Sequence, residues 1–126
     1  MAVSPHDLVI EAKAQIKEVS TIEGQALLGK RIIIDVREYD EYVAGHLPGA
    51  INIPRGVLEF KIGTVPECAN KDGAYLLYCR TSGRAALSAV QLQKIGYGDI
   101  VSMAGGFEFW ANEGRPTEKP IPVNFE

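Results

Sequence analysis

The stretch from residue 74 to residue 84 is Ala74-Tyr75-Leu76-Leu77-Tyr78-Cys79-Arg80-Thr81-Ser82-Gly83-Arg84, an apolar run followed directly by a polar loop. The continuous apolar character of residues 74–78 predicts a short strand that is covered on both faces. After the loop, residues 84–95 place their apolar side chains largely on one face of a helix. This order of strand, loop and helix predicts a helix that packs on the sheet containing the strand.

Further strands and helices are expected to alternate on either side of this stretch. The strongest strand signal is the apolar run of residues 31–36, with Asp35 at its carboxyl end. Shorter strands are predicted at 16–19, 50–53 and 100–103, helices at 4–15, 20–29, 38–44, 55–60 and 107–112, and a loop with one helical turn at 61–73. Strands that alternate with helices predict an α/β domain with a parallel sheet and helices on both faces.

The composition is that of an ordinary globular domain. The chain has 126 residues, of which 46% are hydrophobic and 23% are charged, which suits one domain with one core. Its net charge of -3 gives no overall attraction to nucleic acid or anionic lipid, so neither is an expected partner. We predict no membrane span and no secretory signal, and therefore a cytoplasmic location.

Cys79 is the leading candidate for a reactive residue. In a parallel sheet, ligands bind beyond the carboxyl ends of the strands, where Cys79 would face the start of the next helix. The free N–H groups at a helix N-terminus attract anions, and together with Arg80 and Arg84 they favour a thiolate. The alternatives are that Cys79 is a small buried hydrophobic residue and that Arg80 is only a solvated loop charge.

Four stretches between about residues 16 and 115 carry further information. They are Ile34-Asp35-Val36-Arg37-Glu38; Gly45-His46-Leu47-Pro48-Gly49-Ala50-Ile51-Asn52-Ile53-Pro54; Tyr78-Cys79-Arg80-Thr81-Ser82-Gly83-Arg84-Ala85; and Gly105-Gly106-Phe107-Glu108-Phe109-Trp110. Together, and in this order, they resemble the rhodanese family in its single-domain form.

The resemblance implies a central, mostly parallel five-stranded sheet and sulfur transfer through a persulfide on Cys79. It also implies that Asp35 and Arg37 support the loop rather than touch the substrate. The expected substrates are a small anionic sulfur donor, such as thiosulfate, and a thiophilic acceptor, such as cyanide, a small thiol or a protein thiol. No cofactor or metal is expected. The residues expected to bind the substrate are Arg80, Thr81, Ser82, Gly83 and Arg84.

Two other functions remain open at this point. Relatives with a seven-residue loop act as phosphatases or arsenate reductases, whereas the loop from Cys79 to Arg84 has six residues and suits a single added sulfur. A non-catalytic interaction module is the other alternative, although the presence of Cys79 weighs against it. The expected division is a helical extension at 1–15, a rhodanese-like domain at 16–115 and an extended tail at 116–126, in a monomer or weak homodimer.

Three further residues invite a functional assignment. His46 is interpreted as a structural hydrogen-bonding residue, because a thiolate needs no general base. Cys68 could resolve a persulfide, but we interpret it as incidental. Arg55 could reach the rim of the site or could equally be a surface charge at a helix start.

Overall fold

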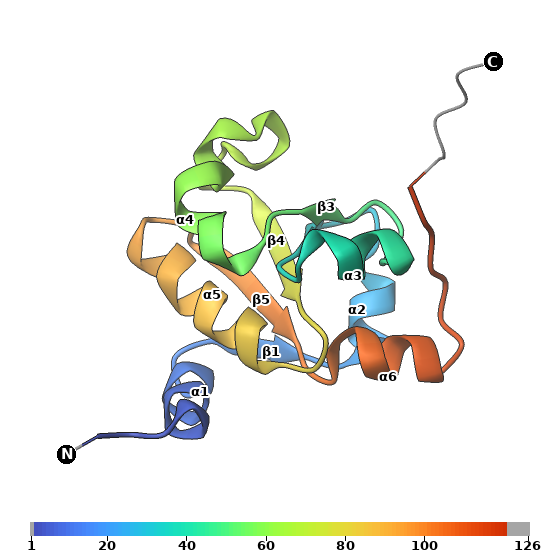
Figure 1. The fold of residues 1–126 in the computed structure, drawn as a ribbon. Coiled ribbons are helices and arrows are strands. Elements are labelled where there is room, and N and C mark those ends of the chain that lie inside the picture. Colours follow the sequence, from blue (N-terminus) through green and yellow to red (C-terminus); the bar gives the residue numbers. More distant parts are fainter. Residues whose placement is uncertain (1, 121–126) are drawn as a thin grey trace.

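The computed structural model describes residues 2–120, which fold around one sheet (Figure 1). The strands are β1 (Lys17–Val19), β2 (Ile32–Asp35), β3 (Ile51–Asn52), β4 (Ala74–Tyr78) and β5 (Asp99–Met103). The α-helices are α1 (Pro5–Lys13), α2 (Thr21–Ala26), α3 (Tyr39–Ala44), α4 (Leu58–Lys61), α5 (Gly83–Lys94) and α6 (Gly106–Asn112), and short 3-10 helices are η1 (Arg55–Val57), η2 (Ile62–Thr64) and η3 (Pro66–Cys68).

The five strands are all parallel and lie in the order β1-β5-β4-β2-β3. The strand β4 therefore occupies the centre, paired with β2 on one side and β5 on the other. Its burial on both faces explains its continuous apolar sequence, because all-parallel sheets are covered by their crossover helices. The predicted α/β fold with a five-stranded parallel sheet is confirmed.

Helices cover both faces of this sheet (Figure 1). On one face α4 and α5 pack over a core that includes Leu77, Ala89 and Leu92. On the other face α2, α3 and α6 enclose a second core around Leu76 and Trp110. The helix α1 packs against the outer side of α5 rather than against the sheet.

Local sequence signals explain where several helices begin. Ser4 accepts a hydrogen bond of 3.0 Å from the backbone N–H of Asp7, and the Asp7 carboxylate accepts one from the backbone N–H of Ser4. The same reciprocal capping links Ser20 and Glu23 at the start of α2. Each pair satisfies N–H groups that have no partner inside the helix, which is why these short segments begin as predicted.

Some boundaries differ from the sequence-based prediction. The helix predicted at 20–29 ends at Ala26, and the one predicted at 55–60 begins as the 3-10 helix η1. The segment 61–73 contains two 3-10 helices instead of one helical turn, because Gly63 and Pro66 interrupt it. The last helix begins at Gly106, one residue earlier than expected.

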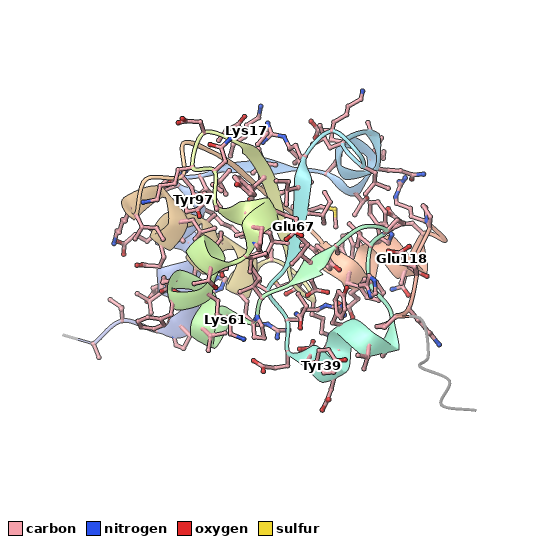
Figure 2. The ribbon with its side chains drawn as sticks, turned by 90° about the horizontal axis from the view of Figure 1, so that it is seen from above. Lys17, Tyr39, Lys61, Glu67, Tyr97 and Glu118 are labelled. Carbon is pink, nitrogen blue, oxygen red and sulfur yellow. The ribbon has the colours of Figure 1, made fainter. Side chains whose placement is uncertain are left out.

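Hydrogen bonds hold part of the chain after α6 against the rest of the protein. Glu118 and His46 exchange two backbone hydrogen bonds of 2.9 Å, so the tail lies beside the segment between α3 and β3, where Figure 2 labels Glu118. Residues 121–126 of the predicted tail lie outside the described residues. Among residues 2–120, no helix combines the length and apolar character needed to cross a membrane.

Candidate active site

Cys79 lies at the carboxyl end of the central strand, where the chain leaves β4 for α5. Its neighbour Tyr78 is still held in the sheet, because the Tyr78 carbonyl accepts a hydrogen bond of 3.1 Å from the N–H of Val36. Cys79 itself is 1% exposed. The thiol is therefore positioned by the middle of the sheet rather than by a mobile surface loop.

The backbone around the thiol presents hydrogen-bond donors. The N–H of Ala85 donates to the Cys79 Sγ atom at 3.3 Å. The N–H groups of residues 80–84 have no acceptor within the part of the chain that the structure describes. Five free donors at the start of a twelve-residue helix form a cradle for negative charge.

The opposite side of the loop is held by α6. The backbone N–H groups of Phe107 and Glu108 donate to the carbonyl oxygens of Cys79 and Arg80, each at 2.9 Å. Gly106 permits this approach, since a Cβ atom there would lie 2.5 Å from the Cys79 carbonyl oxygen. Because the carbonyl oxygens of Cys79 and Arg80 are bonded to α6, the N–H groups of the loop remain available to a ligand.

The two loop arginines have different environments. Arg84 donates hydrogen bonds of 2.8 and 3.0 Å to the two carboxylate oxygens of Glu41 in α3. These bonds hold the pKa of Glu41 well below its usual value, at about 2. The side chain of Arg80 is 70% exposed and lies 3.9 Å from Glu108, so it is much less constrained.

Asp35 and Arg37 form a buried ion pair next to the loop. The Arg37 Nη2 atom donates to Asp35 Oδ2 at 2.7 Å and to the carbonyl of Gly45 at the same distance. The Arg37 guanidinium also lies 4.3 Å from the ring centroid of Phe107. The pair thus joins the end of β2, the end of α3 and the start of α6.

Tyr78 connects this pair to the strand that carries the thiol. Its hydroxyl donates to Asp35 Oδ2 at 2.7 Å and accepts from the N–H of Leu47 at 3.1 Å. Burial, with the nearby Asp35 carboxylate, strongly raises the pKa of Tyr78. The hydroxyl therefore stays protonated and keeps donating to Asp35 across the neutral pH range.

Cys68 and Arg55 each contact residues that are not part of the loop. The carbonyl of Cys68 accepts a hydrogen bond from Tyr97, whose ring contacts Tyr75 near the start of β4. Cys79 follows the other end of that strand. At about 3.3 Å per residue, the Cα atoms of Tyr75 and Cys79 are on the order of 10 Å apart. Burial raises the pKa of Cys68 to about 11. Arg55 pairs with Glu59 at 2.9 Å, as an ordinary i,i+4 ion pair.

His46 is buried and held by its surroundings. Its Nδ1 atom lies 3.0 Å from the carbonyl oxygen of Tyr42, and its ring stacks on the Tyr42 ring at 3.8 Å between centroids. Its Nε2 atom is 3.6 Å from the Glu118 carboxylate. These contacts agree with a structural role for His46.

A shallow cavity of about 340 Å³ adjoins the loop. Its wall is formed by residues from four parts of the chain that are far apart in the sequence: the segment after β2, α3, the loop and α6. They are Arg37, Glu41, Ala44, Arg80, Phe107 and Glu108.

Three residues of this site were missed or only partly interpreted from the sequence. No motif in the sequence links Glu41 to Arg84, and Tyr78 was predicted only as a strand residue. Gly106 was noted only within the stretch that begins Gly105-Gly106-Phe107. The Gly-Gly pair was the one usable signal, because consecutive glycines often mark a close approach of two backbone segments.

Comparison with known proteins gives a consistent result. The family model for the rhodanese-like domain matches residues 15–113. A sulfurtransferase of Allochromatium vinosum is 28% identical over 71% of this chain and 79% of its own length. The thiosulfate sulfurtransferase GlpE of Coxiella burnetii is 31% identical over 75% of this chain and 86% of its own.

A solved structure also matches over almost the whole length. It is that of RPA3614 from Rhodopseudomonas palustris, a protein of unknown function described as a possible tyrosine phosphatase. The TM-score is 0.85 at 28% identity, and the match covers 94% of this chain and 96% of that one.

Proposed function

This chain belongs to the family of rhodanese-like domains, as a rhodanese-type sulfurtransferase, and we propose that it moves a sulfane sulfur through a persulfide on Cys79. The donor is thiosulfate or a persulfide, and the acceptor is a thiophile such as cyanide or a thiol. One observation supports this most directly. The Cys79 thiol lies beside five backbone N–H groups that have no acceptor among residues 2–120.

In the first step the Cys79 thiolate attacks the outer sulfur of thiosulfate. The new bond joins the two sulfur atoms, and the bond within thiosulfate breaks to release sulfite with its electron pair. The product is a Cys79 persulfide whose terminal sulfur carries a negative charge. The N–H groups of residues 80–84, from Arg80 through Thr81, Ser82 and Gly83 to Arg84, stabilise that charge as an oxyanion hole would.

In the second step the acceptor takes the terminal sulfur. Cyanide attacks it to give thiocyanate, or a thiolate attacks it to give a new persulfide, and in both cases Cys79 leaves as the thiolate. The enzyme returns to its starting state, so the overall scheme is ping-pong. No cofactor takes part in either step.

The arginines support these steps in different ways. Arg80, with its exposed guanidinium, attracts an anionic donor and favours the departure of sulfite. Arg84 adds positive charge near the thiolate while Glu41 fixes its position. Asp35 and Arg37 hold the turn and α6 against the loop.

Intact-protein mass spectrometry after incubation with thiosulfate tests this proposal. We expect one added sulfur atom, which cyanide removes as thiocyanate. The Cys79→Ala variant should take up no sulfur, whereas Cys68→Ala, which removes the buried thiol at the far end of β4, should take it up normally. Absence of uptake by the wild-type protein, or equal uptake by Cys79→Ala, would reject the proposal.

A phosphatase is the second candidate, favoured by the likeness to RPA3614. A six-residue loop is the argument against it, because a phosphoryl group needs a wider ring of N–H groups than a single sulfur. Hydrolysis of p-nitrophenyl phosphate or reduction of arsenate, lost in Cys79→Ala, would establish this function in place of sulfur transfer. Failure of all three assays would leave the non-catalytic interaction module. A cytoplasmic location and a monomeric or weakly dimeric state stay predictions.

A further inference from the structure

We propose that the cavity beside the loop binds the carboxylate of a small thiol acceptor, with Arg37 as the group that recognises it. This inference rests on the proposed sulfur transfer and specifies its second substrate. The cavity volume of about 340 Å³ is near the lower end of the range of about 300–1,000 Å³ typical of small-molecule sites. It therefore suits a compact molecule rather than a folded partner.

The guanidinium of Arg37 has one nitrogen left for a ligand. Nε and Nη2 donate to Asp35 and to the Gly45 carbonyl, whereas Nη1 has no acceptor among residues 2–120. The side chain is 5% exposed, yet it forms part of the cavity wall. A buried guanidinium that is paired with Asp35 and still has one nitrogen without an acceptor, in a residue that lines the cavity, suits one carboxylate oxygen, because little water competes there.

The acidic residues of the wall do not cancel this preference. Both carboxylate oxygens of Glu41 are occupied by Arg84, which neutralises that charge. Glu108 is partly exposed and lies 3.9 Å from Arg80, so solvent and Arg80 both screen it. The ring of Phe107 adds apolar surface for the carbon chain of the thiol.

The position of the cavity fits the second step. Arg80 directly follows Cys79, and Phe107 donates its N–H to the Cys79 carbonyl, so two wall residues border the thiol's own backbone. A thiol whose carboxylate binds Arg37 would thus be held beside the loop. Its thiolate attacks the terminal sulfur of the Cys79 persulfide, the S–S bond of that persulfide breaks, and a small-molecule persulfide leaves as Cys79 regains its thiolate.

Two acceptors that differ only in charge test the proposal. N-acetylcysteine carries a carboxylate, and N-acetylcysteine amide carries a neutral amide in its place. The protein is first loaded with sulfur, and the rate of persulfide discharge is then followed by intact mass at a fixed thiolate concentration. We expect N-acetylcysteine to discharge the wild-type persulfide about tenfold faster, the effect of one charge-assisted hydrogen bond.

Substitutions of the exposed Ala44 provide the matched variants. Ala44→Glu brings a negative charge to the cavity wall, and Ala44→Gln adds the same bulk without charge. With cyanide discharge used to normalise each variant, Ala44→Glu should lose the preference for N-acetylcysteine and Ala44→Gln should keep it. Equal wild-type rates for the two thiols, or the same ratio in both variants, would overturn the proposal.

The outcomes separate this inference from the proposed function. If no persulfide forms, or cyanide does not remove it, sulfur transfer itself is wrong. If the persulfide forms and cyanide removes it, but the two thiols react equally, only the carboxylate site is wrong.

Discussion

The guanidinium of Arg84 donates hydrogen bonds of 2.8 and 3.0 Å to the two carboxylate oxygens of Glu41, a residue 43 positions earlier in the chain. The bidentate pair joins Arg84, the last residue of the loop that begins at Cys79, to α3. Glu41 is consequently a positioning residue for the site, although it touches no reacting atom.

Replacement of Glu41 by Gln should destabilise the protein in a pH-dependent manner. The pKa of Glu41 is lowered from 4.5 to about 2, so the pair contributes fully above about pH 4.5 and is lost as the pH falls towards 2. Since both side chains are about one-third exposed, we expect a loss of only about 0.5–1 kcal/mol at pH 7. Urea unfolding of both proteins at several pH values measures this loss. A difference that stays constant down to pH 2 would contradict the assignment.

Gly106 should tolerate no side chain. Its φ of +57° is a left-handed conformation, and an added Cβ would lie 2.5 and 2.6 Å from the carbonyl oxygens of Cys79 and Arg80. We expect Gly106→Ala to lose about 3 kcal/mol of stability through strain and overpacking, and most of its sulfur uptake through displacement of the loop. Denaturant unfolding and intact mass measure the two effects.

Gly114→Ala is the matched control for this substitution. Gly114 has a φ of +72°, but a Cβ there would meet nothing within 4 Å. It should therefore show only the backbone strain of about 1 kcal/mol and normal sulfur uptake. Equal losses in the two variants would mean that the contact between α6 and the loop has no special importance.

Tyr78→Phe and Tyr97→Phe compare two buried hydroxyl groups. Tyr78 bonds to Asp35 and Leu47 beside the site, whereas Tyr97 bonds to the Cys68 carbonyl at the other end of β4. Each loss leaves buried polar groups without a partner, so each should cost about 1–3 kcal/mol of stability. Only Tyr78→Phe should also slow sulfur uptake, by about tenfold, because it loosens the ion pair that orients the loop. Equal slowing in both variants would indicate a general effect of stability.

Local patterns predict much of this structure and none of its long-range pairing. The buried strand β2 and the capping pair of Ser20 and Glu23 follow from neighbouring residues, and the structure has both. The loop that begins at Cys79 could also be chosen as the candidate site, because Cys79 and two arginines lie within six residues. By contrast, the partner of Arg84 depends on where α3 packs, and no local rule selects Glu41 over Glu38 or Asp40.

The free nitrogen of Arg37 was equally beyond sequence reasoning. The likeness of the stretch containing Asp35 and Arg37 to the rhodanese family indicates a supporting role. It does not tell how many guanidinium nitrogens the support uses. The structure shows that Asp35 and Gly45 accept hydrogen bonds from Nε and Nη2, so that Nη1 has no acceptor among residues 2–120.

The two cysteines should react very differently with iodoacetamide. Cys68 is fully buried and its pKa is raised to about 11, so almost none of it is thiolate at neutral pH. Cys79 is 1% exposed, but its Sγ atom accepts from the Ala85 N–H and lies beside the N–H groups of residues 80–84, which have no acceptor among residues 2–120. We therefore expect one alkylated cysteine in the native protein, located at Cys79 by peptide mapping, and two in urea. Prior loading with thiosulfate should place the added sulfur on the Cys79 peptide alone. Modification of Cys68 in the native protein at a comparable rate would show that the far end of β4 opens readily, and that Cys68 is accessible to a persulfide after all.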